Sequence, residues 1–385
     1  MIKIKKYEDI ENDFFEGRPF DDANEVVLSV LDEVQKKGDA ALRIYGQKFD
    51  VSVPAVFEVP QEELKAAAEK LKINKREIYD ALVYSHTLAL KFAQEQRKSF
   101  SDFETELEPG IITEKKTIPV EKAGCYVPAG RFPLLSSVIM TVTPAVAAGV
   151  GEVIMCTPPR VHPDDVSESS KSGAGVPGKA FVGGKPYADE GVMAAAYICG
   201  VNHLYAVGGA QAIGAMAYGT ESIPKVDVIV GPGNKYVATA KKLVYGKVGI
   251  DMIAGPTEVM IIADGSANAE WVAADLLAQA EHDVVAQPIL VTTSTALAEK
   301  VSAEIENQLE TLTTKATARQ SIDNFGVIII ADSLEQAAEI ANKKAPEHLE
   351  LALEQGEERT KLESLVHNYG SLFIGHYAAE VYGDY

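Results

Sequence analysis

Apolar and polar positions alternate along the chain with two different periods. In the first hundred residues the apolar positions recur every three or four residues, which is the spacing of amphipathic helices. The first such run contains Val26, Val27, Val30, Leu31 and Val34. Gly38 interrupts the pattern, Asp39 is placed to cap a second helix, and two more helices are predicted over residues 62–72 and 75–98. We expect this helical N-terminal region to provide packing and a dimer surface.

From residue 117 onward, short apolar runs alternate with helical stretches. Strands are predicted over residues 124–127, 152–156, 203–207, 226–230, 259–263, 288–292, 327–331 and 371–374. Helices are predicted between them, over residues 137–148, 189–199, 211–218, 236–244, 269–282 and 334–343. This alternation is typical of parallel sheets with helices on both faces, and the number of strands favours two sheets. The run 250–256 is predicted to return the chain from one sheet to the other.

Composition narrows the class of protein. At 385 residues the chain is too long for one ordinary core, so two or more domains are expected. A net charge of −20 argues against nucleic-acid binding, which requires a basic surface. The chain contains no run of eighteen apolar residues, and its basic start lacks the apolar core of a signal peptide, so we expect no membrane span and a cytoplasmic location.

Two further features have simple structural interpretations. Cys125, Cys156 and Cys199 lie in apolar contexts without metal-ligand spacing, and we interpret them as structural thiols. The segment 163–184 is rich in Ser and Gly and is predicted to form a long mobile surface loop.

Gln279 and His282 form the first candidate site. They lie three residues apart at the end of the predicted helix 269–282, for which Asn268 or Ser266 is the expected cap, so both side chains lie on one face. An amide oxygen and an imidazole can both bind zinc, although two more ligands would be needed. The alternative is a helix end whose His complements the C-terminal dipole.

Glu347 and His348 form the second candidate site. Pro346 suits the first turn of a helix, so the pair is predicted to lie at a helix N-terminus. There the positive end of the helix dipole would keep the imidazole neutral and able to accept a proton. Alternatively, Glu347 only complements the dipole and His348 lies on the surface.

Several glycine-containing turns are candidates for ligand binding. The turns 207–211 and 230–234 each follow a predicted strand and open a helix, although neither has the usual dinucleotide-binding spacing of glycines. Arg131 lies in a third strand-end loop and could bind an anionic group, and residues 254–258 form a fourth turn. These turns are expected to converge outside the carboxyl ends of the strands. Asp384, near the last residue, is either a metal ligand or part of a disordered tail.

From about residue 20 to its end, the chain resembles the histidinol dehydrogenase family. The matching motifs are Gly208–Ile213, Tyr218–Asp227, Gly231–Asn234, Gly249–Pro256, Ala273–His282 and Ala345–His348. The resemblance implies an α/β protein with two incomplete Rossmann-like parallel-sheet domains. We assign residues 1–20 to an N-terminal arm, residues 21–125 and 255–385 to a domain with the zinc and catalytic residues, and residues 126–254 to an NAD-binding domain.

The resemblance also implies the chemistry. Members of the family are homodimers that use zinc and two NAD molecules to oxidise a primary alcohol to a carboxylate through a bound aldehyde. The carried-over zinc ligands are Gln279, His282 and Asp384, and the carried-over catalytic residues are His348, the base for the alcohol proton, and Glu347, which activates water. The residues expected to contact NAD are Tyr126, Gln211 and Asn234.

Some positions depart from the family pattern. Members continue for a few dozen residues beyond Gly383-Asp384-Tyr385, and that tail supplies another zinc ligand, a His; we expect truncation here rather than an inactive chain. Thr257, at a position where a Ser is expected in histidinol enzymes, and Arg131, which suits a sulfonate, favour a branch that oxidises sulfopropanediol to sulfolactate. Oxidation of L-histidinol to L-histidine is the alternative, and a non-catalytic protein that binds metal or ligand is the alternative from another class.

Overall fold

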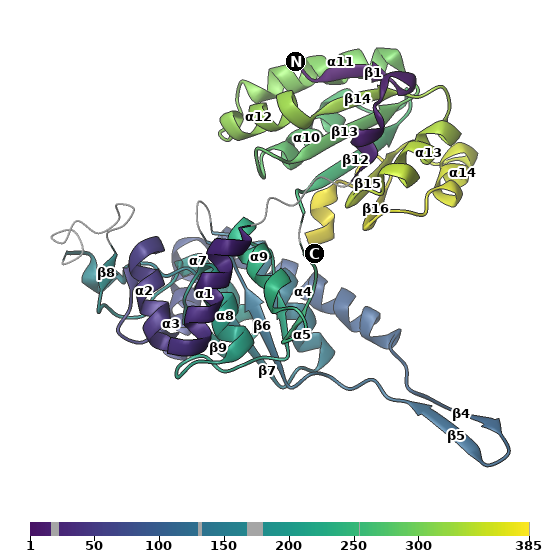
Figure 1. Cartoon of the computed structure of the whole chain (residues 1–385). Coiled ribbons are helices and arrows are strands. Elements are labelled where there is room, and N and C mark those ends of the chain that lie inside the picture. The colour runs from purple at the N-terminus through teal and green to yellow at the C-terminus, as the bar shows by residue number, and fades with distance from the viewer. Residues whose placement is uncertain (17–22, 130–132, 168–179, 254, 385) are drawn as a thin grey trace. The chain divides into compact units, whose positions relative to one another are not determined.

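The computed structural model describes residues 1–16, 23–129, 133–167, 180–253 and 255–384. The chain divides into two compact units. Unit 1 contains residues 1–20 and 255–383, and unit 2 contains residues 21–254 together with the last two residues. Figure 1 shows that each unit is a sheet covered by helices. The predicted α/β class with two sheets is therefore confirmed, and the chain passes from unit 2 to unit 1 after residue 254, within the predicted return segment.

Unit 1 is built on a six-stranded sheet whose order is β1-β14-β13-β12-β15-β16 in the described residues. The strands are β1 (Lys3–Lys6), β12 (Glu258–Ala263), β13 (Gln287–Thr292), β14 (Val327–Ile330), β15 (His348–Ala352) and β16 (Ser371–Ile374). All neighbours in this sheet are parallel. The near-continuous apolar runs of β12, β13 and β14 follow from this, because a parallel sheet is buried on both faces.

Helices cover both faces of the sheet of unit 1. One apolar core lies under α10 (Ala269–Ala280), α11 (Thr295–Leu309) and α12 (Lys315–Phe325). The other lies under α13 (Leu334–Lys344) and α14 (Glu357–Leu365), where Phe14 and Phe15 of the N-terminal segment also pack. The N-terminal residues therefore belong to unit 1 through β1 and these aromatic rings, and do not form a separate arm.

Unit 2 contains a second six-stranded sheet, with the order β11-β10-β6-β7-β9-β3 in its described residues. The strands are β3 (Glu58–Val59), β6 (Lys122–Tyr126), β7 (Glu152–Thr157), β9 (His203–Ala206), β10 (Val228–Val230) and β11 (Gly249–Ile250). Only β3 runs antiparallel to its neighbour. The short strands β2 (Ser52–Val53) and β8 (Phe181–Val182) pair separately, and residues 168–179 of the predicted long loop lie outside the described residues.

Helices also cover both faces of the sheet of unit 2. One core lies under α1 (Asn24–Lys37), α2 (Asp39–Phe49), α8 (Gly209–Tyr218) and α9 (Lys235–Val244). The other lies under α3 (Gln61–Asn74), α4 (Arg76–Lys98), α5 (Leu135–Ala148) and α7 (Glu190–Cys199). The structure thus groups residues 21–125 with residues 126–254, which differs from the predicted domains. The reason is that α1–α4 pack on the two faces of this sheet and β6 is one of its inner strands.

Three local features complete the fold. The prediction that Asp39 caps α2 is wrong. Asp39 is the first residue of α2, and its carboxylate accepts hydrogen bonds from the backbone N–H and the hydroxyl of Ser222. The three cysteines are buried and free of disulfides, as expected of structural thiols. The strands β4 (Phe103–Glu108) and β5 (Ile111–Lys115) form a hairpin after α4. Within the described residues, no helix has the length and apolarity that crossing a membrane requires.

Candidate functional site

Gln279 lies in the last turn of α10 and is fully buried. Neither its amide oxygen nor its amide nitrogen has a hydrogen-bond partner among the described residues. The predicted cap of this helix is confirmed, because the Asn268 side chain accepts hydrogen bonds from the backbone N–H groups of Glu270 and Trp271. Burying an amide without hydrogen bonds destabilises the folded state. Gln279 is therefore a candidate ligand-binding group.

His282 lies just beyond the end of α10 and is exposed. Its backbone N–H donates to the carbonyl oxygen of Gln279 at 3.3 Å, but α10 ends at Ala280, two residues before the predicted end of the helix. Gln279 is buried and His282 exposed, so the structure does not place the two side chains on one helix face as predicted. The described residues contain no group of three or more His, Cys, Asp or Glu side chains that could hold a metal ion. The side chain of Asp384, the third expected zinc ligand, lies outside the described part of the chain.

The prediction that Glu347 and His348 begin a helix is wrong. Residues Pro346 and Glu347 lie in the short connection between α13 and β15, and His348 is the first residue of β15. The strand lies between β12 and β16, with Leu349 and Leu351 buried on one face of the sheet. The helix-dipole argument for a neutral imidazole therefore does not apply to His348.

A backbone carbonyl orients the imidazole of His348 instead. Its Nδ1 lies 3.2 Å from the carbonyl oxygen of Glu258 and 3.5 Å from a carboxylate oxygen of the buried Glu380. A carbonyl oxygen can only accept, so Nδ1 carries the proton and the lone pair of the neutral ring is on Nε2. The ring is only partly exposed and lies 6.0 Å from that of Phe373.

Glu258, at the start of β12, links the surrounding groups. Its backbone N–H donates to Oε2 of Glu347 at 3.2 Å, and its own carboxylate accepts from the buried ammonium of Lys344 at 2.8 Å. The other oxygen of Glu347, Oε1, has no hydrogen-bond partner among the described residues, and 45% of this side chain is exposed. Glu347 can therefore bind water while its position is held by the strand beside it.

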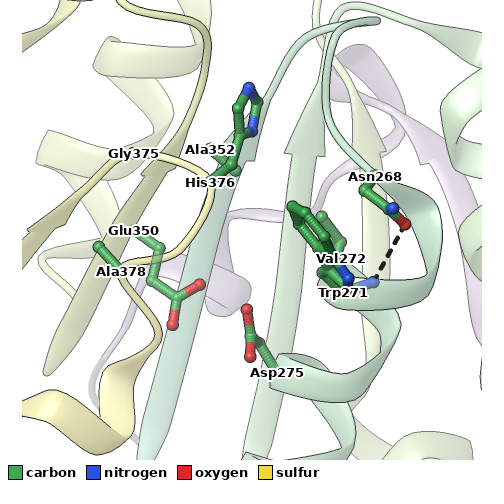
Figure 2. A pocket seen from close by; sticks show the side chains of 9 residues that line it. All are labelled: Asn268, Trp271, Val272, Asp275, Glu350, Ala352, Gly375, His376 and Ala378. Carbon is green, nitrogen blue, oxygen red and sulfur yellow. Dashed lines mark hydrogen bonds between the residues drawn. The ribbon is translucent and has the colours of Figure 1, made fainter.

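Two carboxyl groups lie close together beneath these residues. Figure 2 shows Asp275 of α10 and Glu350 of β15 pointing toward one another in a small pocket that Trp271 and His376 also line. Burial raises the pKa of Asp275 to about 6. Burial and the charge of Asp275 raise the pKa of Glu350 well above its usual value. The pair therefore holds a proton more readily than surface carboxyls do.

The candidate groups of unit 2 lie at the carboxyl ends of its strands. Tyr126 ends β6 and is buried, and its phenolic oxygen accepts a hydrogen bond from the backbone N–H of Gly209, at the start of α8, at 3.0 Å. Gln211, in the first turn of α8, is also buried, and its amide nitrogen lies 3.5 Å from a carboxylate oxygen of Asp50. Burial raises the pKa of Asp50 to about 7.

Asn234 and Gly231 lie at the end of the neighbouring strand β10. Asn234 is exposed and caps α9, accepting from the backbone N–H groups of Tyr236 and Val237 at 3.0 and 3.2 Å. Gly231 has a φ of +122°, and a Cβ there would lie 2.1 Å from the carbonyl oxygen of Tyr126. The buried Lys241 donates to the carbonyl oxygen of Gly231, whose N–H donates to Asp251. This turn is therefore held closely against the end of β6.

The structure thus separates the predicted site residues into two groups. In unit 1, Thr257, Glu347, His348 and the end of α10 lie at the amino edge of the sheet, because each precedes or begins a strand or ends the helix that runs back to that edge. The expected convergence at carboxyl ends holds for the turns of unit 2 and not for the turn 254–258, which leads into β12. Arg131 lies outside the described residues.

Sequence reasoning did not find four of the polar groups around these residues. Glu258 and Glu380 contact His348, Asp50 contacts Gln211, and Glu350 faces Asp275. Glu350 has a usable signal, because a lone acidic residue within the apolar run Leu349–Leu353 has to be buried if that run is a strand. The other three are ordinary acidic residues in sequence, and only the fold brings them to their partners.

Comparison with known proteins identifies the family. The family model described as histidinol dehydrogenase matches residues 16–176 and 174–385. A histidinol dehydrogenase of Streptococcus mutans is 44% identical over 364 residues, covering 94% of this chain and 78% of its own length. One from Aquifex aeolicus is 44% identical over 366 residues, covering 93% of this chain and 76% of its own length.

A solved structure agrees with these relatives. The crystal structure of histidinol dehydrogenase from Elizabethkingia anophelis has a TM-score of 0.85 and 32% identity, and the match covers 100% of this chain and 82% of that one. The family match and the relatives together cover almost the whole chain. The chain therefore belongs to the histidinol dehydrogenase family of NAD-dependent oxidoreductases.

Proposed function

We propose that this protein oxidises L-histidinol to L-histidine in two NAD-dependent steps through a bound aldehyde. The observation that supports this substrate is the similarity to histidinol dehydrogenases along almost the whole chain, with up to 44% identity. The arrangement of unit 1 supports the reaction type, because a proton acceptor, a carboxylate and an unpartnered amide lie at one edge of one sheet.

His348 is the proposed base for the alcohol proton. The Glu258 carbonyl holds the proton on Nδ1, which leaves Nε2 as an acceptor. As hydride leaves the carbinol carbon for NAD, Nε2 takes the hydroxyl proton, and the products are the aldehyde, NADH and a protonated imidazole. The carboxylate of Glu380 lies 3.5 Å from Nδ1 and stabilises the positive charge that forms on the ring.

Glu347 is the proposed base for the second step. Its Oε2 is fixed by the Glu258 N–H, and its Oε1 is open to a water molecule. Removing a proton from that water lets the oxygen add to the aldehyde carbon, and loss of a second hydride to NAD then gives the carboxylate. Retaining the aldehyde between the steps prevents its escape and its side reactions.

The end of α10 and the residues just after it fit a zinc ion, which the family uses. Gln279 supplies a buried amide oxygen that lacks a partner, and His282 supplies an imidazole one turn away, so these two residues would hold the ion, with Asp384 as a further proposed ligand. When bound, zinc would orient the alcohol and favour its ionised form.

NAD is proposed to bind at the carboxyl ends of β6, β9 and β10 in unit 2. Tyr126, Gln211 and Asn234 are the proposed contacts: Tyr126 ends β6, Gln211 lies in the first turn of α8, and Asn234 caps α9. Backbone N–H groups at such helix starts suit the phosphates of a dinucleotide.

A second candidate substrate is sulfopropanediol. Thr257, which precedes β12 beside the proposed base, supports it, as does the sequence argument from Arg131. The named relatives, however, are histidinol dehydrogenases, so the comparisons favour L-histidinol.

The test is NADH formation by the zinc-loaded full-length protein with L-histidinol and, separately, with 2,3-dihydroxypropane-1-sulfonate. Two NADH per L-histidinol is the expected result. Turnover of the sulfonate alone would show that the proposed substrate is wrong and would leave the proposed mechanism unchanged. Tightly bound zinc with no NADH from either alcohol would favour a binding protein without catalytic activity.

Matched variants test the two bases. His348→Asn is expected to lose more than about a hundredfold in kcat, because the proton acceptor is missing. Glu347→Gln should retain the first NADH and slow the second. His367→Asn, an exposed histidine of the same unit, is the control and should keep full activity.

A further inference from the structure

Glu350 is an acidic residue in the middle of a buried strand. It lies in β15, and only 3% of it is exposed. Its neighbours Leu349 and Leu351 pack in the core under α13 and α14. Side chains of a strand point alternately to its two faces, so Glu350 shares the opposite face with His348. Burying a carboxyl group within an apolar sheet destabilises the folded state unless the group has specific partners.

The first partner of Glu350 is the backbone of Glu380. The N–H of Glu380 donates to Oε1 of Glu350 at 2.8 Å, and both residues are buried. Glu380 is the first residue of the short 3-10 helix η4 (Glu380–Asp384), and Oε2 of its side chain lies 3.5 Å from Nδ1 of His348. Glu350 therefore fixes the backbone that carries the carboxylate beside the proposed base.

The second partner of Glu350 is the carboxyl group of Asp275 in α10. The two carboxyl groups point toward one another (Figure 2), and neither forms an ion pair with a cation in the part of the chain that the structure describes. Burial raises the pKa of both groups, and the charge of Asp275 raises the pKa of Glu350 further. Two facing carboxyl groups without a cation are best accommodated when they share a proton, which Glu350 then donates to the ionised Asp275.

We propose that Glu350 is a positioning residue for the carboxylate of Glu380. Glu350 shares one proton with Asp275, and its Oε1 holds the N–H of Glu380. The role rests on the proposed function, because the position of Glu380 affects the reaction only if its carboxylate stabilises the protonated imidazole of His348. Glu350 and Asp275 have no contact with the substrate in this arrangement and act through Glu380.

Two substitutions of Glu350 separate the hydrogen bond from the packing. Glu350→Gln keeps an acceptor for the N–H of Glu380, and its amide can donate to the ionised Asp275, so it reproduces the protonated carboxyl. Glu350→Leu has neither group. With zinc-loaded protein and L-histidinol, Glu350→Leu is expected to lower kcat about ten- to hundredfold, because the misplaced Glu380 no longer stabilises the charged ring. The KM for NAD should stay unchanged, and Glu350→Gln should keep most of the wild-type kcat.

Two further variants show whether the effect passes through Glu380. Leu351→Ala removes a buried side chain from the other face of β15, so it should lower stability and keep kcat wherever the protein is folded. Glu380→Gln keeps the backbone N–H and removes the charge. If Glu350 acts through Glu380, adding Glu350→Leu to Glu380→Gln should lower kcat by no more than about twofold. Equal kcat for the wild type and Glu350→Leu would overturn the positioning role while the proposed function stands.

Infrared spectroscopy tests the shared proton without any substrate. The C=O stretch of a protonated carboxyl is separate from the bands of carboxylates and amides. The difference spectrum between the wild type and Glu350→Gln at pH 7 is expected to contain one such band, and its absence would refute the shared proton. A wild type that forms no NADH from either alcohol would refute the proposed function instead, and the infrared band would still test the Asp275–Glu350 pair.

Discussion

Asp50 shows how one buried carboxyl makes stability depend on pH. Burial beside Gln211 raises its pKa from 3.8 to about 7. In the unfolded chain the carboxyl ionises near pH 4, so the folded state loses stability as the pH rises from about 4 to about 7. Asp50→Asn removes this loss. Between pH 5 and pH 8, the free energy of unfolding of this variant should therefore rise by about 1–2 kcal/mol relative to that of the wild type, after allowance for partial solvent screening.

Urea unfolding followed by circular dichroism at both pH values measures the effect of Asp50→Asn. Asp332→Asn, at an exposed position, serves as the control and should follow the wild type. A difference between Asp50→Asn and the wild type that stays constant from pH 5 to pH 8 would show that the Asp50 carboxyl does not titrate in this range.

Gly231 provides a second prediction at the scale of one residue. A Cβ at this position would collide with the Tyr126 carbonyl at 2.1 Å, whereas a Cβ at Gly246, which also has a positive φ, would meet nothing within 4 Å. Gly246→Ala should therefore cost only the backbone strain, about 1 kcal/mol, and Gly231→Ala at least about 3 kcal/mol. Equal losses in the free energy of unfolding would mean that the β10 turn moves freely away from β6.

At the scale of elements, sequence periodicity predicted the apolar strands and the amphipathic helices well. The runs over 259–263, 288–292 and 327–331 appear as β12, β13 and β14 with shifts of one residue at most, and Asn268 caps α10 as expected. Periodicity succeeds there because both faces of the strands are buried and the apolar run is continuous.

The elements that sequence reasoning missed have mixed or short patterns. In β15 the buried Glu350 interrupts the apolar run, and the preceding Pro346 suggested a helix start. β1 is an edge strand with the polar sequence Lys3–Lys6, and its position comes from pairing with β14. The residue types of the candidate site could be predicted from the sequence. The Glu258 carbonyl that orients His348 could not, because it belongs to a neighbouring strand that is distant in the sequence.

The start of α9 yields a prediction that separates helix capping from cofactor binding. Asn234→Ala should lose about 1 kcal/mol of stability because the cap is removed, while Asn234→Asp keeps a capping oxygen. If the amide of Asn234 contacts NAD, both variants should raise the Kd for NAD, measured by calorimetric titration. The pair Asn268→Ala and Asn268→Asp, at the cap of α10, controls for capping alone.

At the scale of the whole molecule, each of the two units has its own sheet and its own apolar cores, and the chain crosses between them near residues 20 and 254. Such units can unfold in separate steps. The single tryptophan of the chain, Trp271, lies in α10 of unit 1. Its fluorescence therefore reports on unit 1, while circular dichroism reports on the helices of both units.

We therefore predict that the fluorescence and circular-dichroism transitions in urea do not coincide. Gly231→Ala in unit 2 should lower the midpoint of part of the circular-dichroism transition and leave the fluorescence midpoint unchanged. Asn268→Ala, which removes the cap of α10 next to Trp271, should shift the fluorescence midpoint by an amount equivalent to about 1 kcal/mol. If Gly231→Ala moves both signals together, the two units unfold as one cooperative body, and strain in the turn after β10 is then felt at α10 as well.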